Sequence, residues 1–419
     1  MGSSKMTRLG VAMGLLGLIA SMASAADWPQ FQGPDRNGIS PETGLLHAFP
    51  EGGPKVLWTV TLGEGYGAPV IRDGKVYLLD RQENQREVMR CWDLASGKEE
   101  WSAQYDAPGE VDHNGSRGSP AVDDKYVFSV GVFGDFVCFS RAGHKILWRK
   151  NILKDFGGNK PMWAVAQSPL LYKNWVIVAP QSPTVGVAAL EKATGRVVWK
   201  SKTMGKMDYS SPLVTQVAGQ DQIVMENGSR VVGIDPANGE ILWTYEGLPV
   251  KTAQVPPPTP IGDGRFFVSG GYDAGCAMFK VEKKDGKFAV TELFKNMNCN
   301  AHIHNMILYK GFLYASCNTN SKKDGLVCLD LDGNVKWKTG KSPNFDKGNF
   351  IFADGVMYIM DGAGGQLRIV DPTPDGYKQL AEAKLLGGKE IWAPMALSNG
   401  KLVCRDQHQM KCVDLAAPK

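Results

Sequence analysis

The sequence predicts an all-β fold, an eight-bladed β-propeller, from three observations. Glycine and proline account for 49 and 24 of the 419 residues, so turns interrupt the chain too often for a helical bundle. A turn with glycine followed by a strand with tryptophan recurs about every 45 residues. Between the copies lie alternating apolar segments joined by Asp-Gly or Asn-Gly turns, which are typical of antiparallel hairpins.

Residues 1–25 are predicted to be a signal peptide of the Sec type. Lys5 and Arg8 precede an apolar run over residues 9–19, and Ala23-Ser24-Ala25 supplies the small residues of a cleavage site. Because Ala26 rather than cysteine follows that site, we do not expect a lipoprotein. No later segment is apolar enough to insert into a membrane, so we expect a periplasmic or extracellular protein.

The tryptophan motif has five clear copies in residues 56–419, the region expected to form the propeller. Each copy has an acidic residue or serine, a turn with glycine and then the tryptophan. The five are Trp101, Trp148, Trp199, Trp243 and Trp337. The last interval, 94 residues, is twice the first, 47 residues, which predicts a degenerate copy with Phe294 near the tryptophan position.

Each copy is expected to contain four antiparallel strands. A proline lead, as in Ser119-Pro120 and Ser168-Pro169, begins the first strand of several copies. Four strands in this length are typical of a propeller blade, because one such sheet must pack against its neighbours to bury both faces. Eight copies begin near Tyr66, Ser116, Trp163, Tyr209, Thr252, Asn300, Phe345 and Ile391.

The two chain ends are expected to meet in one blade. The eighth copy lacks an outer strand, and residues 55–59 have the pattern of an outer strand with no blade before it. An N-terminal outer strand would therefore close the ring and leave no unpaired sheet edge. Residues 26–55 form a leader segment before it. Seven blades with an appended piece are the alternative, because the copies around Phe294 and Asp371 are degenerate.

Two of the repeats carry a family resemblance. The segments 190–199 and 234–243 closely resemble the tryptophan-docking repeats of the pyrroloquinoline quinone (PQQ) propeller superfamily, and the likeness extends over residues 56–415. The run Trp28-Pro29-Gln30-Phe31 is similar to the leader of secreted PQQ-like repeat proteins. That superfamily includes quinoprotein alcohol dehydrogenases and an outer-membrane assembly lipoprotein. The resemblance implies the fold, but a shared scaffold does not imply a shared reaction.

The motifs for quinone chemistry are missing from the sequence. Quinoprotein dehydrogenases of the superfamily typically have adjacent cysteines against the quinone, a calcium ion held by carboxylate and amide oxygens, and a catalytic aspartate. This chain has no Cys-Cys dipeptide and no Cys-x-x-Cys-His haem motif. The sequence therefore favours a noncatalytic propeller over an enzyme. A quinoprotein dehydrogenase with PQQ and calcium is kept as the alternative.

The cysteines are expected to serve packing. Cys91, Cys138, Cys328 and Cys412 occupy one repeat position, where other copies have alanine or glycine, so this position is predicted to be a tight buried slot. Cross-strand disulfides between Cys404 and Cys412, or between Cys317 and Cys328, are the alternative in an oxidising compartment. No cysteine and histidine spacing matches a zinc module.

A candidate binding site follows from the repeat register. The loops entering the innermost strands and the loops between second and third strands share one face of a propeller, around its channel. Ten candidate ligand-binding residues fall on these loops, namely Arg117, Trp163, Tyr209, Tyr272, Asp273, His302, His304, Trp392, Asp406 and His408. A solvated polar rim, with the aromatic residues packed in the blades, is the alternative interpretation.

The residue types on this face suggest the ligand. His302 and His304 are alternate residues, which would point the same way in a strand and bind a metal ion or an acidic group. Imidazole and guanidinium groups beside aromatic rings favour an anionic or hydroxylated ligand. We therefore expect a binding scaffold for a small molecule, a glycan or a protein segment. A net charge of +4 gives no reason to expect a nucleic acid.

Overall fold

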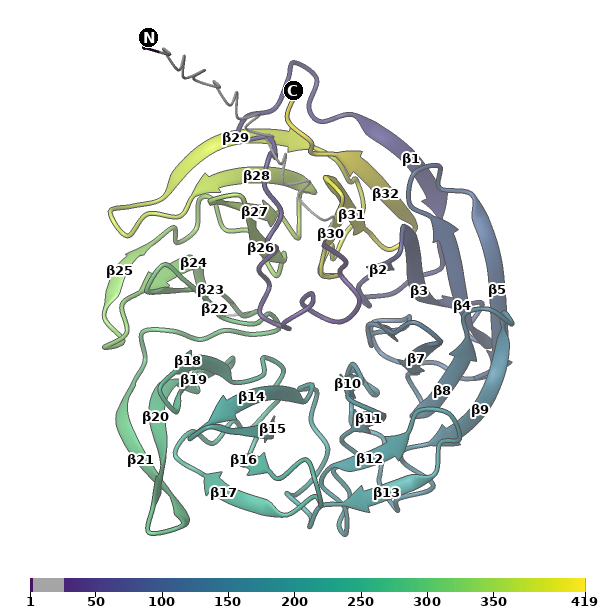
Figure 1. The fold of residues 1–419 in the computed structure, drawn as a ribbon, viewed down its shortest axis with the longest axis vertical. Helices are drawn as coiled ribbons and strands as arrows, with labels where there is room; N and C mark the ends of the chain where they lie inside the picture. The colour runs from purple at the N-terminus through teal and green to yellow at the C-terminus, as the bar shows by residue number, and fades with distance from the viewer. Residues whose placement is uncertain (3–25, 321, 419) are drawn as a thin grey trace.

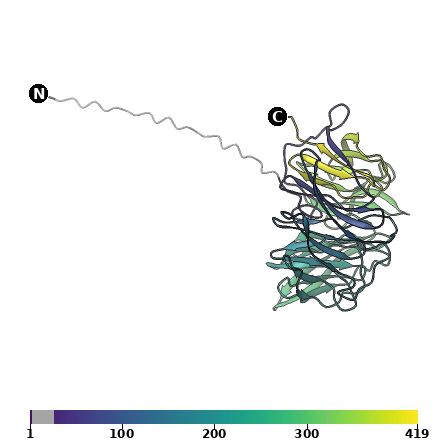
Figure 2. The same ribbon diagram turned by 90° about the vertical axis from the view of Figure 1, so that its right-hand side faces the viewer.

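A computed structural model describes residues 1–2, 26–320 and 322–418 of the chain. The predicted signal peptide lies almost entirely outside the described residues. Eight four-stranded antiparallel sheets follow one another around a central axis, which confirms the eight-bladed propeller (Figure 1). Figure 2 shows the ring from its side. Residues 26–320 and 322–418 form no helix with the length and hydropathy that a membrane span requires.

The first four blades come from the N-terminal half of the chain. Blade one contains β2 (Val70–Arg72), β3 (Lys75–Gln82), β4 (Arg86–Asp93) and β5 (Glu99–Asp106). Blade two contains β6 (Ala121–Val122), β7 (Tyr126–Val130), β8 (Asp135–Ser140) and β9 (Lys145–Asn151). Blade three contains β10 (Leu170–Tyr172), β11 (Trp175–Val178), β12 (Ala188–Glu191) and β13 (Val197–Lys200). Blade four contains β14 (Leu213–Val217), β15 (Gln220–Asn227), β16 (Arg230–Ile234) and β17 (Ile241–Tyr245).

The remaining blades complete the ring. Blade five contains β18 (Thr259–Gly262), β19 (Arg265–Gly270), β20 (Gly275–Lys284) and β21 (Lys287–Asn296). Blade six contains β22 (Ile307–Tyr309), β23 (Phe312–Asn318), β24 (Lys323–Leu329) and β25 (Val335–Lys338). Blade seven contains β26 (Phe350–Ala353), β27 (Val356–Met360), β28 (Gln366–Asp371) and β29 (Lys378–Lys384). Blade eight contains β30 (Ala396–Ser398), β31 (Lys401–Arg405), β32 (Gln409–Asp414) and β1 (Val56–Thr61).

Blade eight closes the ring as the sequence predicts. The N-terminal strand β1 pairs antiparallel with β32, the last strand of the chain, with Thr59 opposite Lys411. Trp58 is buried, and its Nε1 donates a hydrogen bond to the carbonyl oxygen of Leu94 in blade one at 2.8 Å. The strand that completes blade eight therefore also attaches this blade to the first one.

The repeated tryptophan and glycine belong to one contact between successive blades. Trp199 of blade three donates from Nε1 to the carbonyl oxygen of Pro236 in blade four at 2.8 Å. Its ring lies against the turn glycine Gly239, where a Cβ atom would be 2.5 Å from Trp199 Cε3. Gly239 also has a φ of 81°, which residues with side chains rarely adopt. Trp148 and Gly195 repeat this contact between blades two and three.

The degenerate copy has the register that the spacing predicts. Phe294 on β21 lies opposite Met278, beside a β-bulge, just as Trp199 lies opposite Ala189 beside a bulge. In blade seven Ala381 takes the corresponding place, opposite Ile369. The sequence motif is lost in these blades, but the strand pairing is kept.

The proline leads also connect neighbouring blades. The hydroxyl oxygen of Ser168 accepts a hydrogen bond from the backbone N–H of Ser119 at 3.0 Å. Ser211 Oγ accepts from the Ser168 N–H at 2.9 Å, and Ser119 Oγ accepts from the Ala68 N–H at 3.1 Å. These serines form a hydrogen-bonded belt around the first half of the channel, which orients the loops above it.

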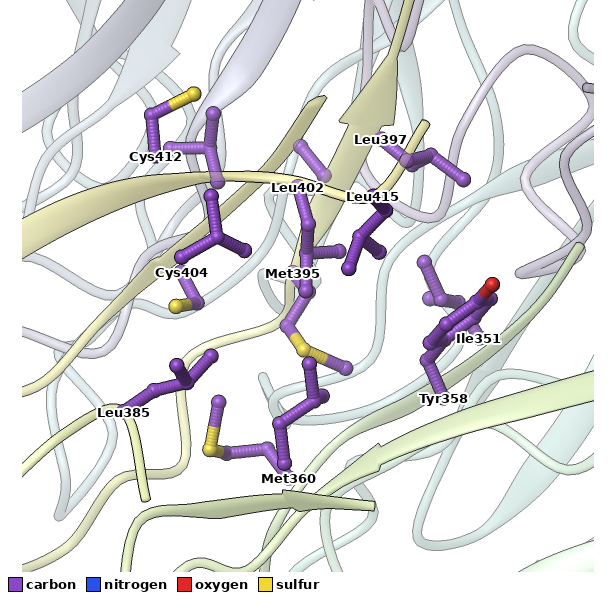
Figure 3. Close-up of a cluster of buried hydrophobic side chains, with 14 of the residues drawn as sticks. Ile351, Tyr358, Met360, Leu385, Met395, Leu397, Leu402, Cys404, Cys412 and Leu415 are labelled. Atoms are coloured by element: carbon purple, nitrogen blue, oxygen red, sulfur yellow. The ribbon is translucent and has the colours of Figure 1, made fainter. Parts of the chain in front are cut away.

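The cores lie between blades, and the cysteines are part of them. Cys91, Cys138, Cys328 and Cys412 are fully buried opposite a tryptophan, which confirms the predicted slot. Figure 3 shows the cluster around blade eight, with Met360, Leu385 and Met395 packed together.

The two disulfide pairs of the alternative interpretation do not form, and all eight cysteines are free thiols. Cys412 lies opposite Val403, whereas Cys404 lies opposite Lys411, so the two side chains point to opposite faces of the sheet (Figure 3). Cys317 packs in the cluster between blades five and six, and Cys328 packs in the cluster between blades six and seven. A sheet lies between the partners of each expected pair.

The leader crosses the centre of the ring before it reaches β1 (Figure 1). Trp28 forms an isolated bridge with Ile71 of blade one, and Ile39 forms one with Phe352 of blade seven. Leu45 pairs with Ala416 near the C-terminus. The leader thus contacts blade one and blade seven, the two neighbours of blade eight in the ring.

Candidate functional site

A pocket of about 250 Å³ lies on the propeller axis. Each of the eight loops that enter an innermost strand contributes a residue to its wall. In chain order these are Tyr66, Arg117, Trp163, Tyr209, Ala253, His302, Lys347 and Trp392. Tyr272 and Asn320 come from loops between second and third strands, and Phe31 comes from the leader. The short loops of a rigid ring therefore converge on one volume.

Six phenylalanine, tyrosine and tryptophan rings line the pocket. The Trp392 ring lies 5.6 Å from the ring of Tyr66 and 5.7 Å from that of His113, measured between centroids. Trp163 and Tyr209 are 5.8 Å apart, and the Tyr209 hydroxyl oxygen accepts a hydrogen bond from the Trp163 N–H at 3.2 Å. These rings present flat apolar faces to a ligand.

Arg117 supplies one of two cationic groups in the wall. Its guanidinium donates hydrogen bonds to the backbone carbonyl oxygens of Gly115 at 2.9 Å, His113 at 2.6 Å and Asp112. It lies 5.8 Å from the centroid of the Tyr66 ring. Burial lowers the pKa of Arg117 to about 10, because the charged form loses hydration.

Lys347 is the second cationic group, and it is 7% exposed. Its ammonium nitrogen lies 4.2 Å from the centroid of the Trp392 ring and donates to Asn320 Oδ1 at 3.1 Å. Burial lowers the pKa of Lys347, although the nearby Asp346 carboxylate acts in the opposite direction. Both cations are therefore held with part of their hydration removed.

The acidic residues of this region stand behind the wall. No aspartate or glutamate is among the described residues that line the pocket. Glu390 accepts the hydroxyl hydrogen of Tyr66, and Asp346 Oδ2 accepts from the indole N–H of Trp392 at 2.7 Å. These two carboxylates hold aromatic rings in place, while the surface that faces the pocket carries positive charge.

The two histidines of the His302-x-His304 motif both line the pocket but have different surroundings. His302 packs edge-on to the Tyr272 ring at 4.9 Å, and its buried Nδ1 has no hydrogen-bond partner among the described residues. His304 Nε2 donates to the Lys347 carbonyl oxygen at 2.7 Å, and its Nδ1 accepts from Asn349 Nδ2 at 3.4 Å. Burial lowers the pKa of each histidine to about 4, so both are neutral at pH 7.

His304 is therefore a structural support, with both ring nitrogens hydrogen-bonded. Its bond to the Lys347 backbone fixes the segment that presents the Lys347 ammonium group.

Within residues 26–320 and 322–418, no three histidine, cysteine or acidic side chains come together in a way that could hold a metal ion.

Seven of the ten candidate residues meet at the pocket, and three do not. Arg117, Trp163, Tyr209, Tyr272, His302, His304 and Trp392 line it. Asp273 and His408 are exposed outside it. Asp406 is buried in a turn, where its Oδ1 accepts hydrogen bonds from the N–H groups of His408 and Gln409. The repeat register predicts the face on which these loops gather but not which side chains of a loop turn inward.

Two important lining residues are absent from the ten candidates. Lys347 follows Asn344 and Asp346 in the loop before β26. Only the backbone path of that loop determines that the lysine, rather than these two neighbours, lines the pocket. Phe31 belongs to the leader, which has no counterpart in the repeat, so repeat reasoning does not place it. The resemblance of the leader to those of other secreted propellers is a signal that could have directed attention to it.

The leader forms the floor of the pocket. Phe31 lies beneath the rings, and the Arg36 guanidinium lies 5.6 Å from the Phe31 ring centroid. Arg36 Nη1 donates to the Pro169 carbonyl oxygen at 3.0 Å, and Nη2 donates to that of Ser168 at 3.4 Å. Arg36 also lines a second cavity, of about 410 Å³, with other leader residues. The leader therefore lines both cavities.

The pocket does not fit PQQ with calcium. Calcium takes several oxygen ligands, usually with carboxylates among them, but no described lining residue has a carboxylate. Arg117 and Lys347 would also repel a divalent cation. None of the cysteines lines the pocket, so no sulfur pair is available to pack against a quinone.

Comparisons with known proteins agree with the fold. The model of the family described as outer membrane protein assembly factor BamB matches residues 84–339. The outer membrane protein assembly factor BamB of Shewanella oneidensis is 25% identical over 221 residues, which are 52% of this chain and 52% of that protein. The chain thus matches about half the length of this curated relative.

Solved structures of low sequence identity share the architecture. The quinohemoprotein alcohol dehydrogenase from Comamonas testosteroni has a TM-score of 0.63 at 13% identity, covering 94% of this chain and 81% of that chain. BamB from Moraxella catarrhalis has a TM-score of 0.60 at 13% identity, covering 87% of this chain and 98% of that chain. At such identities the likeness shows the fold alone. Because the family model covers more than half of the sequence, this chain belongs to the BamB-like family of PQQ-type β-propellers.

Proposed function

We propose that the chain is an exported binding propeller whose axial pocket holds a small anion that contains a ring. A sugar acid and an aromatic carboxylate both have this chemistry. The proposal depends on one observation: the two charged side chains on the pocket wall that are cationic at pH 7, Arg117 and Lys347, stand among aromatic rings, and no described lining residue is acidic.

An anion in the pocket would compensate the positive charge of the wall. Removing water from a charged group is unfavourable unless an opposite charge or hydrogen bonds replace it. Arg117 and Lys347 have already lost part of their hydration, as their lowered pKa values indicate. A carboxylate beside either group would accept a hydrogen bond from it.

Calorimetric titration with two matched pairs of probes tests the proposal. The pairs are glucuronate with glucose, and 4-hydroxybenzoate with 4-hydroxybenzamide. We expect at least one acid to bind at least 10-fold more tightly than its neutral partner, which corresponds to about 1.4 kcal/mol. If neither acid binds more tightly than its partner, the proposed ligand class is wrong.

The variant Lys347→Met locates the site. Methionine keeps an apolar chain over the Trp392 ring but removes the charge, so we expect the acid to bind at least 10-fold more weakly. Lys389→Met is the control, because Lys389 is exposed on the loop before blade eight and does not line the pocket. Equal losses in both variants would mean that general surface charge, rather than the pocket, attracts the anion.

The family supports a second candidate, the binding of a protein segment. The curated relative is named as an assembly factor for outer membrane proteins. An unfolded outer-membrane protein diluted from urea is a suitable probe, and a binding propeller would delay its aggregation. If the wild type delays the aggregation of the probe and Lys347→Met does not, the pocket binds a protein segment.

Export is part of the proposal. The predicted signal peptide implies that mature protein secreted by a host begins at Ala26. Intact-mass measurement of the exported chain tests this, and residues before Ser24 retained in that chain would contradict it.

A further inference from the structure

A cluster of three buried cysteines lies behind the histidine loop, between blades five and six. Cys276 is on β20, Cys317 is on β23, and Cys299 lies in the segment between β21 and β22. All three are fully buried in one apolar cluster. The Sγ atoms of Cys299 and Cys317 are 3.2 Å apart. The structure shows this pair in contact, in contrast to the two pairs of the alternative interpretation.

We propose that Cys299 and Cys317 form a disulfide bond when the chain folds in an oxidising compartment. The two thiols lose two protons and two electrons as the S–S bond forms. A thiol–disulfide oxidant accepts the electrons and is reduced from its disulfide to its dithiol. Exchange proceeds by attack of one thiolate on the mixed disulfide of the other cysteine with the oxidant.

The geometry favours this pair over the third cysteine. A bond of about 2.05 Å requires the two sulfur atoms to approach by about 1 Å. Cys276 is committed elsewhere, because its thiol donates to Asn296 Oδ1 at 3.1 Å. Cys299 is held in place by the Ser269 hydroxyl, which lies 3.5 Å from its sulfur atom.

Burial determines when the bond forms. Neither sulfur is exposed in the folded chain, so an oxidant reaches the thiols only during folding. A chain that folds in a reducing compartment therefore keeps both thiols, and a chain that folds under oxidising conditions keeps the bond.

The bond would act on the pocket. Cys299 lies three residues before His302, at the start of the loop that leads into β22. Cys317 is on β23, the strand that pairs with β22. A covalent link there anchors the start of the loop that carries both pocket histidines. The consequence is slower opening of this loop, without any change in which residues line the pocket.

Thiol counting on the full chain tests the proposal. The protein is produced in two ways, by export to a bacterial periplasm and in a reducing cytosol. Each preparation is unfolded in guanidinium with N-ethylmaleimide, and the number of alkylated cysteines is read from the intact mass. We expect six alkylated cysteines in the exported protein and eight in the cytosolic protein. Peptide mapping should find one linked pair containing Cys299 and Cys317. Eight alkylated cysteines in the exported protein, or a link through Cys276, would overturn the assignment.

Two variants complete the test, and neither has to fold fully because the count is made on unfolded chains. Exported Cys317→Ser should have seven alkylated cysteines and no linked peptide. Exported Cys404→Ser removes another buried thiol and should have five, with the same linked pair. Hydrogen exchange at residues 300–305 should be slower in the exported wild type than in the cytosolic one. Equal exchange would refute the effect on the loop.

Discussion

Two glycines with similar backbone conformations have different surroundings. Gly219 and Gly239 have φ values of 76° and 81°. A Cβ atom on Gly219 would meet nothing within 4 Å, whereas one on Gly239 would meet the Trp199 ring at 2.5 Å. The comparison separates the cost of the backbone conformation from the cost of a blocked blade contact.

We expect Gly219→Ala to lower the free energy of unfolding by about 1 kcal/mol, the conformational cost alone. Gly239→Ala should lower it by about 2 kcal/mol more, because overpacking a closed contact adds strain. Urea denaturation of both variants measures the difference. If both variants lose the same free energy of unfolding, the Trp199 ring moves away from the new Cβ atom without an energetic cost.

The pocket histidines make the stability depend on pH. Each has a pKa of about 4 in the folded chain, against an ordinary value of 6.5. Between these values the unfolded chain binds more protons, so stability is present above pH 6.5 and is lost as the pH falls to 4. Each histidine accounts for a loss of about 3 kcal/mol over this range.

His302→Gln removes one of these titrating groups. We expect the variant to lose about 3 kcal/mol less stability than the wild type between pH 7 and pH 4. Urea denaturation at the two pH values measures this. His302 is the better position for the test because replacing His304 would also break its bonds to Lys347 and Asn349. A pH profile that is the same in the variant and the wild type would mean that His302 has the same pKa in the folded and the unfolded chain.

At the scale of elements, β1 carries the closure of the ring. It supplies the outer strand of blade eight, and Trp58 packs on the turn at Gly97 in blade one. We expect a chain that begins at Gly63 to be several kcal/mol less stable than one that begins at Pro54, because it loses this strand and a buried tryptophan. Both chains lack the leader, so the difference belongs to β1. Equal melting temperatures would contradict the role of β1 in closure.

At the scale of the whole molecule, the leader crosses the channel and supplies Phe31 to the pocket. Phe31 forms part of the floor, and Ile39 packs on blade seven without lining the pocket. Because Phe31→Ala removes the floor, we expect 4-hydroxybenzoate to bind several-fold more weakly to this variant in calorimetry. Ile39→Ala should bind as the wild type does. If both variants keep the wild-type affinity, the leader does not contribute to binding.

The sequence by itself determined the blades, their number and the closing strand. These features repeat, and the spacing of turns, glycines and tryptophans has to match a contact that recurs between blades. It also determined the face on which the polar and aromatic loops gather, since strand order in a blade sends alternate loops to the same side.

Only the tertiary structure decided which residues meet. Lys347 lines the pocket, whereas its loop neighbours Asn344 and Asp346 do not. Asp406 accepts hydrogen bonds within its own loop, and Phe31 belongs to a segment outside the repeat. The same holds for sulfur, since Cys317 meets Cys299 rather than Cys328. The physical reason is that repeat spacing sets the backbone path, whereas side-chain direction in loops and contacts between distant segments depend on the packing of neighbouring blades.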